Sequence, residues 1–145
     1  MAIMTLIIPK PVPANGNYAP FHIEDRLIYI SGQLPIQNGK LVSSAGDNSF
    51  LDIASLQMEI VTLNLLSHVM YAVNNDKSKI ESCVKLTAYL VPPDDFFEHA
   101  LISNIASDMI NDFLKPKQNH TRTTIGIKSL PLGSLVEADA IFKMY

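Results

Sequence analysis

The sequence predicts an α+β fold in which two helices cover one face of a single β-sheet. Two segments carry apolar residues at helical spacing, and five shorter segments have the alternation or the turn boundaries of strands. Their order is strand, strand, helix, strand, helix, strand, strand. With 145 residues, the chain can bury a core of its own. We therefore expect one domain over residues 1–145.

The N-terminal third is expected to be mostly extended. Residues 1–16 carry three prolines and a glycine, which predict an extended arm. Strands are predicted at Tyr18–Ile23 and Leu27–Ser31, with turn chemistry at Asp25 between them. The stretch from Pro35 to Asn48 lacks helix signals and is predicted to be a loop.

A long helix is predicted from Phe50 to Val73. Its apolar residues form two adjacent stripes, so a sheet or another helix must cover a wide face. The more polar side carries Gln57, Asn64, His68 and Tyr71. Of these residues, we expect His68 to lie on the helix surface.

A strand is predicted from Cys83 to Val91, with Val84 and Leu86 on one face and Cys83 and Lys85 on the other. Pro92 and Pro93 end it. The second helix is expected to begin after Asp94 or Asp95, either of which can cap it. Its apolar positions are Phe97, Leu101, Ile105, Met109 and Phe113.

Two more strands are predicted near the C-terminus, around residues 122–128 and 135–142. Alternation places Arg122, Glu137 and Asp139 together on the sheet face away from the helices. The short link between the strands suggests a hairpin. A guanidinium on that face could hold a carboxylate through two parallel hydrogen bonds, and a carboxylate could move protons or orient water. A structural ion-pair network is the alternative interpretation.

Composition narrows the function classes. Only 17% of residues are charged, so part of the apolar surface is expected to lie against other subunits. The net charge of −3 and a sparse basic region argue against nucleic-acid binding but allow a small anionic ligand. The single cysteine, Cys83, suits a reducing cytoplasm. No apolar run of about 20 residues is apparent, so no membrane association is expected.

Other site chemistries find little support in the sequence. The glycines form neither a dinucleotide-binding nor a P-loop motif. The four histidines lack metal-ligand spacing, so no metal is expected. Cys83 has no base nearby in sequence and is interpreted as a small, half-buried strand residue.

The sequence resembles the YjgF/RidA family of reactive-intermediate deaminases, in a divergent branch. The resemblance runs from Asn17 to Phe142 and depends on the order and spacing of several short segments. These segments are Gly16-Asn17-Tyr18, Ser31-Gly32-Gln33-Leu34-Pro35, Asn64, Arg122-Thr123-Thr124-Ile125-Gly126-Ile127, Leu130-Pro131 and Val136-Glu137-Ala138.

The resemblance implies a chorismate-mutase-like fold, in which a mixed sheet is backed by two helices and three subunits pack with their sheets inward. It also places the last strand away from the Arg122 strand. The Arg122 strand would then lie at an edge of the sheet, where a neighbouring subunit can complete the site.

The function that the resemblance implies is hydrolysis of small 2-imino acids, such as 2-iminobutanoate and 2-iminopropanoate, to 2-oxo acids and ammonia, without a cofactor. Arg122 would bind the substrate carboxylate and Glu137 would orient or activate water. The backbone at Gly32 and Thr124 would position the imine and the water, Tyr18 would close over the ligand, and Ser31 would line the pocket.

Some features depart from the family's pattern. Thr124 stands where members commonly have cysteine, and His120-Thr121 stands where proline or alanine is common. Two alternatives therefore stay open beside the deaminase. One is a trimer that binds small carboxylates without catalysis, and the other is a ribonuclease or translation inhibitor, which the acidic composition disfavours.

Overall fold

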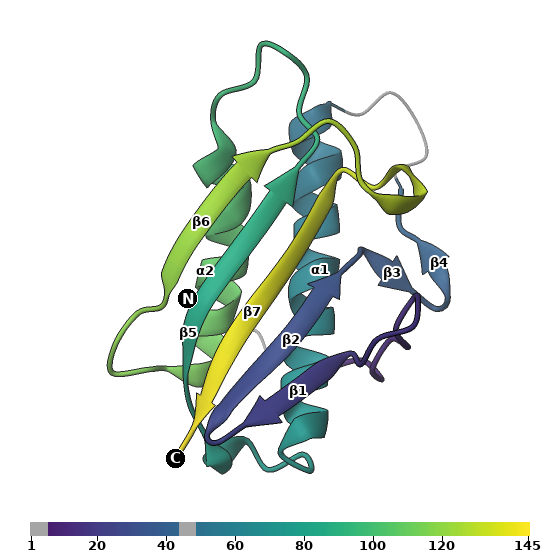
Figure 1. Ribbon diagram of the computed structural model, residues 1–145. Helices are drawn as coiled ribbons and strands as arrows, with labels where there is room; N and C mark the ends of the chain where they lie inside the picture. The colour runs from purple at the N-terminus through teal and green to yellow at the C-terminus, as the bar shows by residue number, and fades with distance from the viewer. Residues whose placement is uncertain (1–5, 44–48) are drawn as a thin grey trace.

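The protein is described by a computed structural model covering residues 6–43 and 49–145. Residues 1–5 of the predicted arm and 44–48 of the predicted loop lie outside the described residues. One five-stranded sheet forms the front layer, and two helices lie behind it (Figure 1). The elements are β1 (Phe21–Glu24), β2 (Leu27–Gln33), β3 (Ile36–Gln37), β4 (Lys40–Leu41), α1 (Phe50–Ala72), β5 (Ile80–Leu90), α2 (His99–Leu114), β6 (Thr121–Gly126) and β7 (Val136–Met144).

The sheet has the strand order β1-β2-β7-β5-β6. β7 runs antiparallel to both β2 and β5 in the middle of the sheet, whereas β6 pairs in parallel with β5 at the edge. The hairpin suggested by the short link is therefore wrong. The mixed sheet implied by the family resemblance is confirmed.

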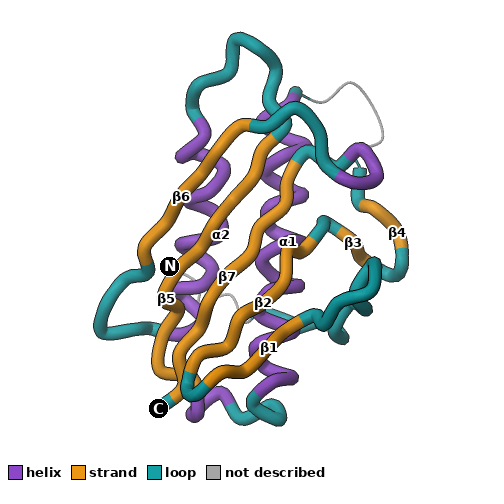
Figure 2. Tube along the Cα trace, in the orientation of Figure 1, coloured by secondary structure: helices purple, strands orange, loops and turns teal. Residues whose placement is uncertain are grey.

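Both helices cover the same face of the sheet (Figure 2). α1 packs behind β2 and β7, and α2 packs behind β5 and β6. The core between the layers includes Val61 and Leu65 of α1, Leu86 of β5 and Phe142 of β7. The other sheet face is open in the single chain and carries exposed apolar side chains, among them Tyr29 and Ile125.

Helix α1 follows the prediction closely, since Ser49 caps its first turn by accepting a hydrogen bond from the backbone N–H of Asp52. Contrary to the expectation from hydropathy, this helix is long and apolar enough to span a membrane by length and composition. However, 56% of the relevant 18-residue window is buried in the protein. Packing in the core therefore accounts for its apolar character.

The more polar side of α1 is largely buried, so the prediction that His68 lies on the helix surface is wrong. Gln57, Asn64 and His68 are all buried, and only Tyr71 is exposed. The N-terminal segment and the loop after β2 cover this side: Ser67 donates a hydrogen bond to the Pro9 carbonyl, 2.8 Å away. Irregular segments can be buried in this way because side chains of the helix satisfy their backbone groups.

Three local details also differ from the prediction. A bulge in the β5–β7 pairing between Cys83 and Lys85 reverses the alternation, so that Cys83 points into the core and Val84 outward. Helix α2 begins at His99 after Glu98, without a side-chain cap from an aspartate. The predicted loop contains a short hairpin, β3–β4, whose Asn38-Gly39 turn has positive φ at both residues.

His68 provides a test of this packing. Its side chain is 1% exposed, and neither ring nitrogen has a hydrogen-bond partner of standard geometry within the described residues. Burial lowers the pKa of His68 from 6.5, an effect that the nearby Val12 backbone offsets in part. We expect His68→Leu to raise the free energy of unfolding by about 1 kcal/mol near neutral pH, because an unsatisfied buried polar group is removed.

The advantage of the leucine variant should grow as the pH falls below about 6.5. There the unfolded state of the wild-type protein takes up a proton more readily than the folded state, so the wild type loses stability. Urea unfolding at about pH 7.5 and 5.5 measures both effects. His22→Leu, at an exposed position, is the control. A leucine variant less stable than the wild type at both pH values would contradict this description.

Candidate functional site

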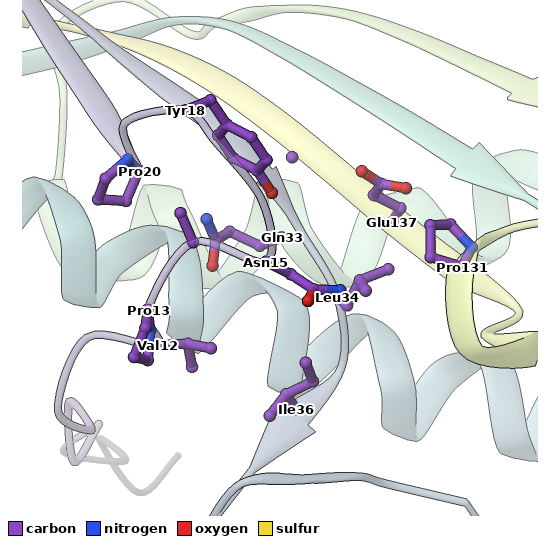
Figure 3. A pocket seen from close by; sticks show the side chains of 12 residues that line it. Val12, Pro13, Asn15, Tyr18, Pro20, Gln33, Leu34, Ile36, Pro131 and Glu137 are labelled. Carbon is purple, nitrogen blue, oxygen red and sulfur yellow. The ribbon is translucent and has the colours of Figure 1, made fainter.

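A small cavity lies where the N-terminal segment crosses the ends of β2 and β7 (Figure 3). Its volume is about 90 Å³. Tyr18 and Glu137 lie on its two sides, and Gln33 and Leu34 come from the end of β2 and the residue after it. The remaining lining residues are Val12, Pro13, Ala14, Asn15, Pro20, Gly32, Ile36 and Pro131. Of the predicted site, Tyr18, Gly32 and Glu137 are thus brought together.

Glycine at position 32 leaves room for Glu137, which occupies the space beside it. A Cβ at position 32 would overlap Oε1 of Glu137 and lie 3.1 Å from its Cδ. The β2–β7 register is irregular between Ile30 and Gln33, so Gly32 lies in a break of the ladder. The absence of a side chain there lets the carboxylate lie directly over the β2 backbone.

Ser31 acts on the backbone next to the cavity and does not line it. Its hydroxyl donates to the Ala19 carbonyl at 2.7 Å, and its backbone N–H donates to the Pro20 carbonyl at 2.9 Å. These two bonds fix the segment that carries Tyr18. Ser31 is therefore at the site, but it fixes the segment that carries Tyr18 and does not line the cavity itself.

Two buried amides of α1 support the cavity from behind. Nδ2 of Asn64 donates to the carbonyls of Leu34 and Ile36, each at 3.0 Å. Gln57 donates to the Val42 carbonyl at 2.9 Å and accepts from the Leu135 N–H at 2.9 Å. The chain after β2 and the chain before β7 are thereby fixed to one helix.

Two carboxylates of β7 lie on the open sheet face next to the cavity. Glu137 and Asp139 point to this face, since Val136, Ala138 and Ala140, which alternate with them along β7, are buried in the core. Burial, and then the charge of Asp139, raise the pKa of Glu137. Burial also raises the pKa of Asp139, while the hydrogen bond that it accepts from the Tyr89 hydroxyl at 3.0 Å and the charge of Lys85 oppose this.

Arg122 and Thr124 lie elsewhere, which corrects the prediction that Arg122 shares a face with Glu137. Arg122 is in register with buried Leu86, and its side chain contacts Asn104 and Ser107 of α2. Thr124 is in register with buried Ala88. Both thus face the helix layer, while Ile125 points to the open face and is 43% exposed. The apolar residue Ile125 therefore lies on the open face of the sheet, and not on the core face that the alternation suggested.

Arg122 and Glu137 are far apart within one chain. Arg122 shares a row with Leu86 and Ala140, so it lies two strands across and three residues along from Glu137. With strands ~4.8 Å apart and a rise of ~3.3 Å per residue, their Cα atoms are roughly 14 Å apart, on opposite faces. One chain therefore does not bring the two predicted catalytic side chains together.

Several residues at or near the site were not predicted from the sequence. Asn15 and Gln33 line the cavity, and Asn104, Ser107 and His120 surround Arg122. Two features of the sequence could have pointed to these residues. Gln33 follows Ser31-Gly32 directly, and His120 stands two residues before Arg122, where proline or alanine is common in the family. Within the described residues, no group of three or more His, Cys, Asp or Glu side chains could hold a metal ion.

This fold and these segments match a known family. Residues 9–143 match the family model described as endoribonuclease L-PSP, which covers the YjgF/RidA proteins. The chain belongs to this family.

The similarity to related proteins extends over nearly the whole chain. Protein TCP17 from Trypanosoma cruzi is 26% identical over 140 residues, covering 94% of this chain and 87% of its own. The crystal structure of Atu1372 from Agrobacterium tumefaciens has a TM-score of 0.82 at 36% identity, covering 92% of this chain and 86% of that one. That of TdcF with bound serine, from E. coli, shares the fold with a TM-score of 0.67 at 20% identity, covering 96% and 98% of the two chains.

The contact between Gly32 and Glu137 predicts a coupled pair of substitutions. Gly32→Ala should preserve the fold, because the end of a glutamate side chain can turn away at a cost of about 0.5–1.5 kcal/mol. In a Glu137→Ala background the same substitution should cost less than about 0.5 kcal/mol, since the overlapping atoms are gone. Urea unfolding of the four proteins gives the coupling. Equal costs in both backgrounds would show that Gly32 is constrained by something else.

Proposed function

We propose that the protein hydrolyses small 2-imino acids to 2-oxo acids and ammonia, at sites that two subunits share. The observation that carries the proposal is the carboxylate of Glu137, half-buried beside Gly32 in a cavity that Tyr18 also lines. A half-buried carboxylate with a raised pKa is a better proton acceptor near neutral pH than an ordinary one.

The reaction needs little beyond a positioned water and a positioned substrate. The water oxygen attacks the carbon of the protonated imine while Glu137 accepts one of the water protons, giving a neutral tetrahedral amino alcohol. Glu137 returns that proton to the nitrogen, and the C–N bond breaks as Glu137 accepts the hydroxyl proton. The 2-oxo acid and ammonia are formed, and the proton on Glu137 passes to the ammonia, which leaves as ammonium. An imine carbon is already electrophilic, so holding the reactants together supplies much of the catalysis.

The substrate carboxylate needs a cation, and Arg122 is our candidate. The separation of Arg122 from Glu137 within one chain supports a site to which one subunit contributes Arg122 and its neighbour contributes Glu137. β6 is an edge strand, where a neighbouring chain can approach Arg122 and Thr124. We propose a homotrimer, which would also cover Tyr29 and Ile125 of the open face.

The size of the cavity favours a small ligand. Ligand pockets for larger molecules are about 300–1,000 Å³, whereas this one holds about 90 Å³. Acidic side chains at Glu137 and Asp139 would also repel phosphates, which disfavours RNA cleavage at this site. The related TdcF holds serine in its crystal structure, which supports a ligand of amino-acid size here. Binding without catalysis is the alternative.

The assembly can be tested directly. Light scattering after gel filtration should give about three times the chain mass of 16.0 kDa. Trimers should persist at micromolar concentration, because the open sheet face provides a wide contact. A monomer would remove the basis for a shared site.

The activity can be tested with an amino-acid oxidase, which generates 2-imino acids in the reaction mixture. The protein should speed formation of the 2-oxo acid above spontaneous hydrolysis, and Glu137→Gln should reduce this acceleration by roughly 10²–10⁴-fold, as expected when a general base is lost. Asp139→Asn, on the same strand face, is the matched control and should retain most of the activity.

Two results would count against the deaminase. No acceleration with imines of small amino acids, together with retained binding of 2-oxo acids, would favour the carboxylate-binding trimer. Full activity of Glu137→Gln would place the chemistry at another group.

A further inference from the structure

Arg122 is held on α2 by one corner of its guanidinium group. Its Nη1 donates to Oδ1 of Asn104 at 2.8 Å and to Oγ of Ser107 at 3.0 Å. Asn104 and Ser107 are three residues apart, so they lie on the same face of the helix. Nη1 carries two hydrogens, and these two acceptors use both.

The opposite edge of the guanidinium remains available. Within residues 6–43 and 49–145, the hydrogen bonds of this group come only from Nη1. Nε and one N–H of Nη2 form a planar pair of parallel donors, which matches the two oxygens of a carboxylate. The chain thus leaves free one of the two edges through which arginine binds carboxylates in a bidentate manner.

His120 supports this arrangement from behind Ser107. Its Nε2 lies 2.8 Å from the Ser107 hydroxyl. A hydroxyl has a single hydrogen, so Ser107 can accept from Arg122 and donate to a neutral His120. Burial, and then the charge of Arg122, lower the pKa of His120, which favours the neutral ring that this arrangement needs.

We propose that Asn104 and Ser107, with His120 behind Ser107, are positioning residues that fix the Nη1 corner of Arg122 and present its Nε–Nη2 edge to the substrate carboxylate. The inference rests on the proposed function of Arg122. It gives His120 and the polar face of α2 a role in substrate selection: a ligand with a planar, charged carboxylate is favoured over an uncharged analogue of the same shape.

The test compares two probes, 2-oxobutanoate and its amide, 2-oxobutanamide, by calorimetry on the assembled protein. Ser107→Ala and Asn104→Ala should each weaken binding of 2-oxobutanoate roughly tenfold, the effect of one lost hydrogen bond. Both should leave binding of the amide unchanged. Ser107→Thr, which keeps a hydroxyl, should restore the affinity. Ser103→Ala is the control, because Ser103 lies one turn earlier on α2 and donates only to the His99 carbonyl.

The outcomes separate the two proposals. If Arg122→Ala loses 2-oxobutanoate binding while Ser107→Ala and Asn104→Ala keep wild-type affinity, the positioning role is wrong and the role of Arg122 stands. Equal losses for both probes would also overturn it, because they would reflect damage to the fold. If the wild type does not bind 2-oxobutanoate, or Arg122→Ala binds it normally, the role of Arg122 fails and the positioning proposal fails with it.

Discussion

The pair of hydrogen bonds from Asn64 to the Leu34 and Ile36 carbonyls is the constraint on which the cavity depends. After β2 the chain leaves the sheet, and its buried carbonyls lose their ladder partners. A single amide on α1 satisfies two of them and fixes the path of the chain after Gly32. Gln57 donates to the Val42 carbonyl before α1 and accepts a hydrogen bond from the Leu135 N–H before β7. Helix α1 is therefore both a core helix and the frame of the site.

The fixed end of β2 determines where the residues around the cavity lie. Because the end of β2 is fixed, Gly32 lies against Glu137, and Ser31 can hold Ala19 and with it Tyr18. The carboxylate is half-buried, and burial together with the neighbouring charge of Asp139 raises its pKa. Arg122, which we propose as the cation for a carboxylate substrate, lies on the other face of the sheet, on edge strand β6. This separation of the proposed carboxylate-binding arginine from the proposed general base within one chain is the physical reason for proposing a site between subunits.

The sequence predicted much of the fold because its strongest signals are periodic. The helix from Phe50 and the outward direction of Glu137 both follow from regular alternation or helical spacing. Arg122 was placed on the wrong face because Ile125 suggested a core-facing side, whereas it points to the open face. Cys83 was reversed by a bulge, and His68 was placed in solvent because the covering arm has no periodic signal. Residues around the site depend on such long-range packing, which local patterns do not encode.

Mixing two inactive variants tests most directly whether Arg122 and Glu137 of different subunits form one site. Arg122→Ala and Glu137→Gln would each be assayed alone, and then after joint unfolding and refolding of equal amounts. If the site is shared between neighbours, random assembly leaves about a quarter of the sites with both native side chains, and about that fraction of wild-type activity should return. If the mixture stays as inactive as its components while mixed trimers form, Arg122 and Glu137 do not act together across a subunit boundary, and the account is wrong.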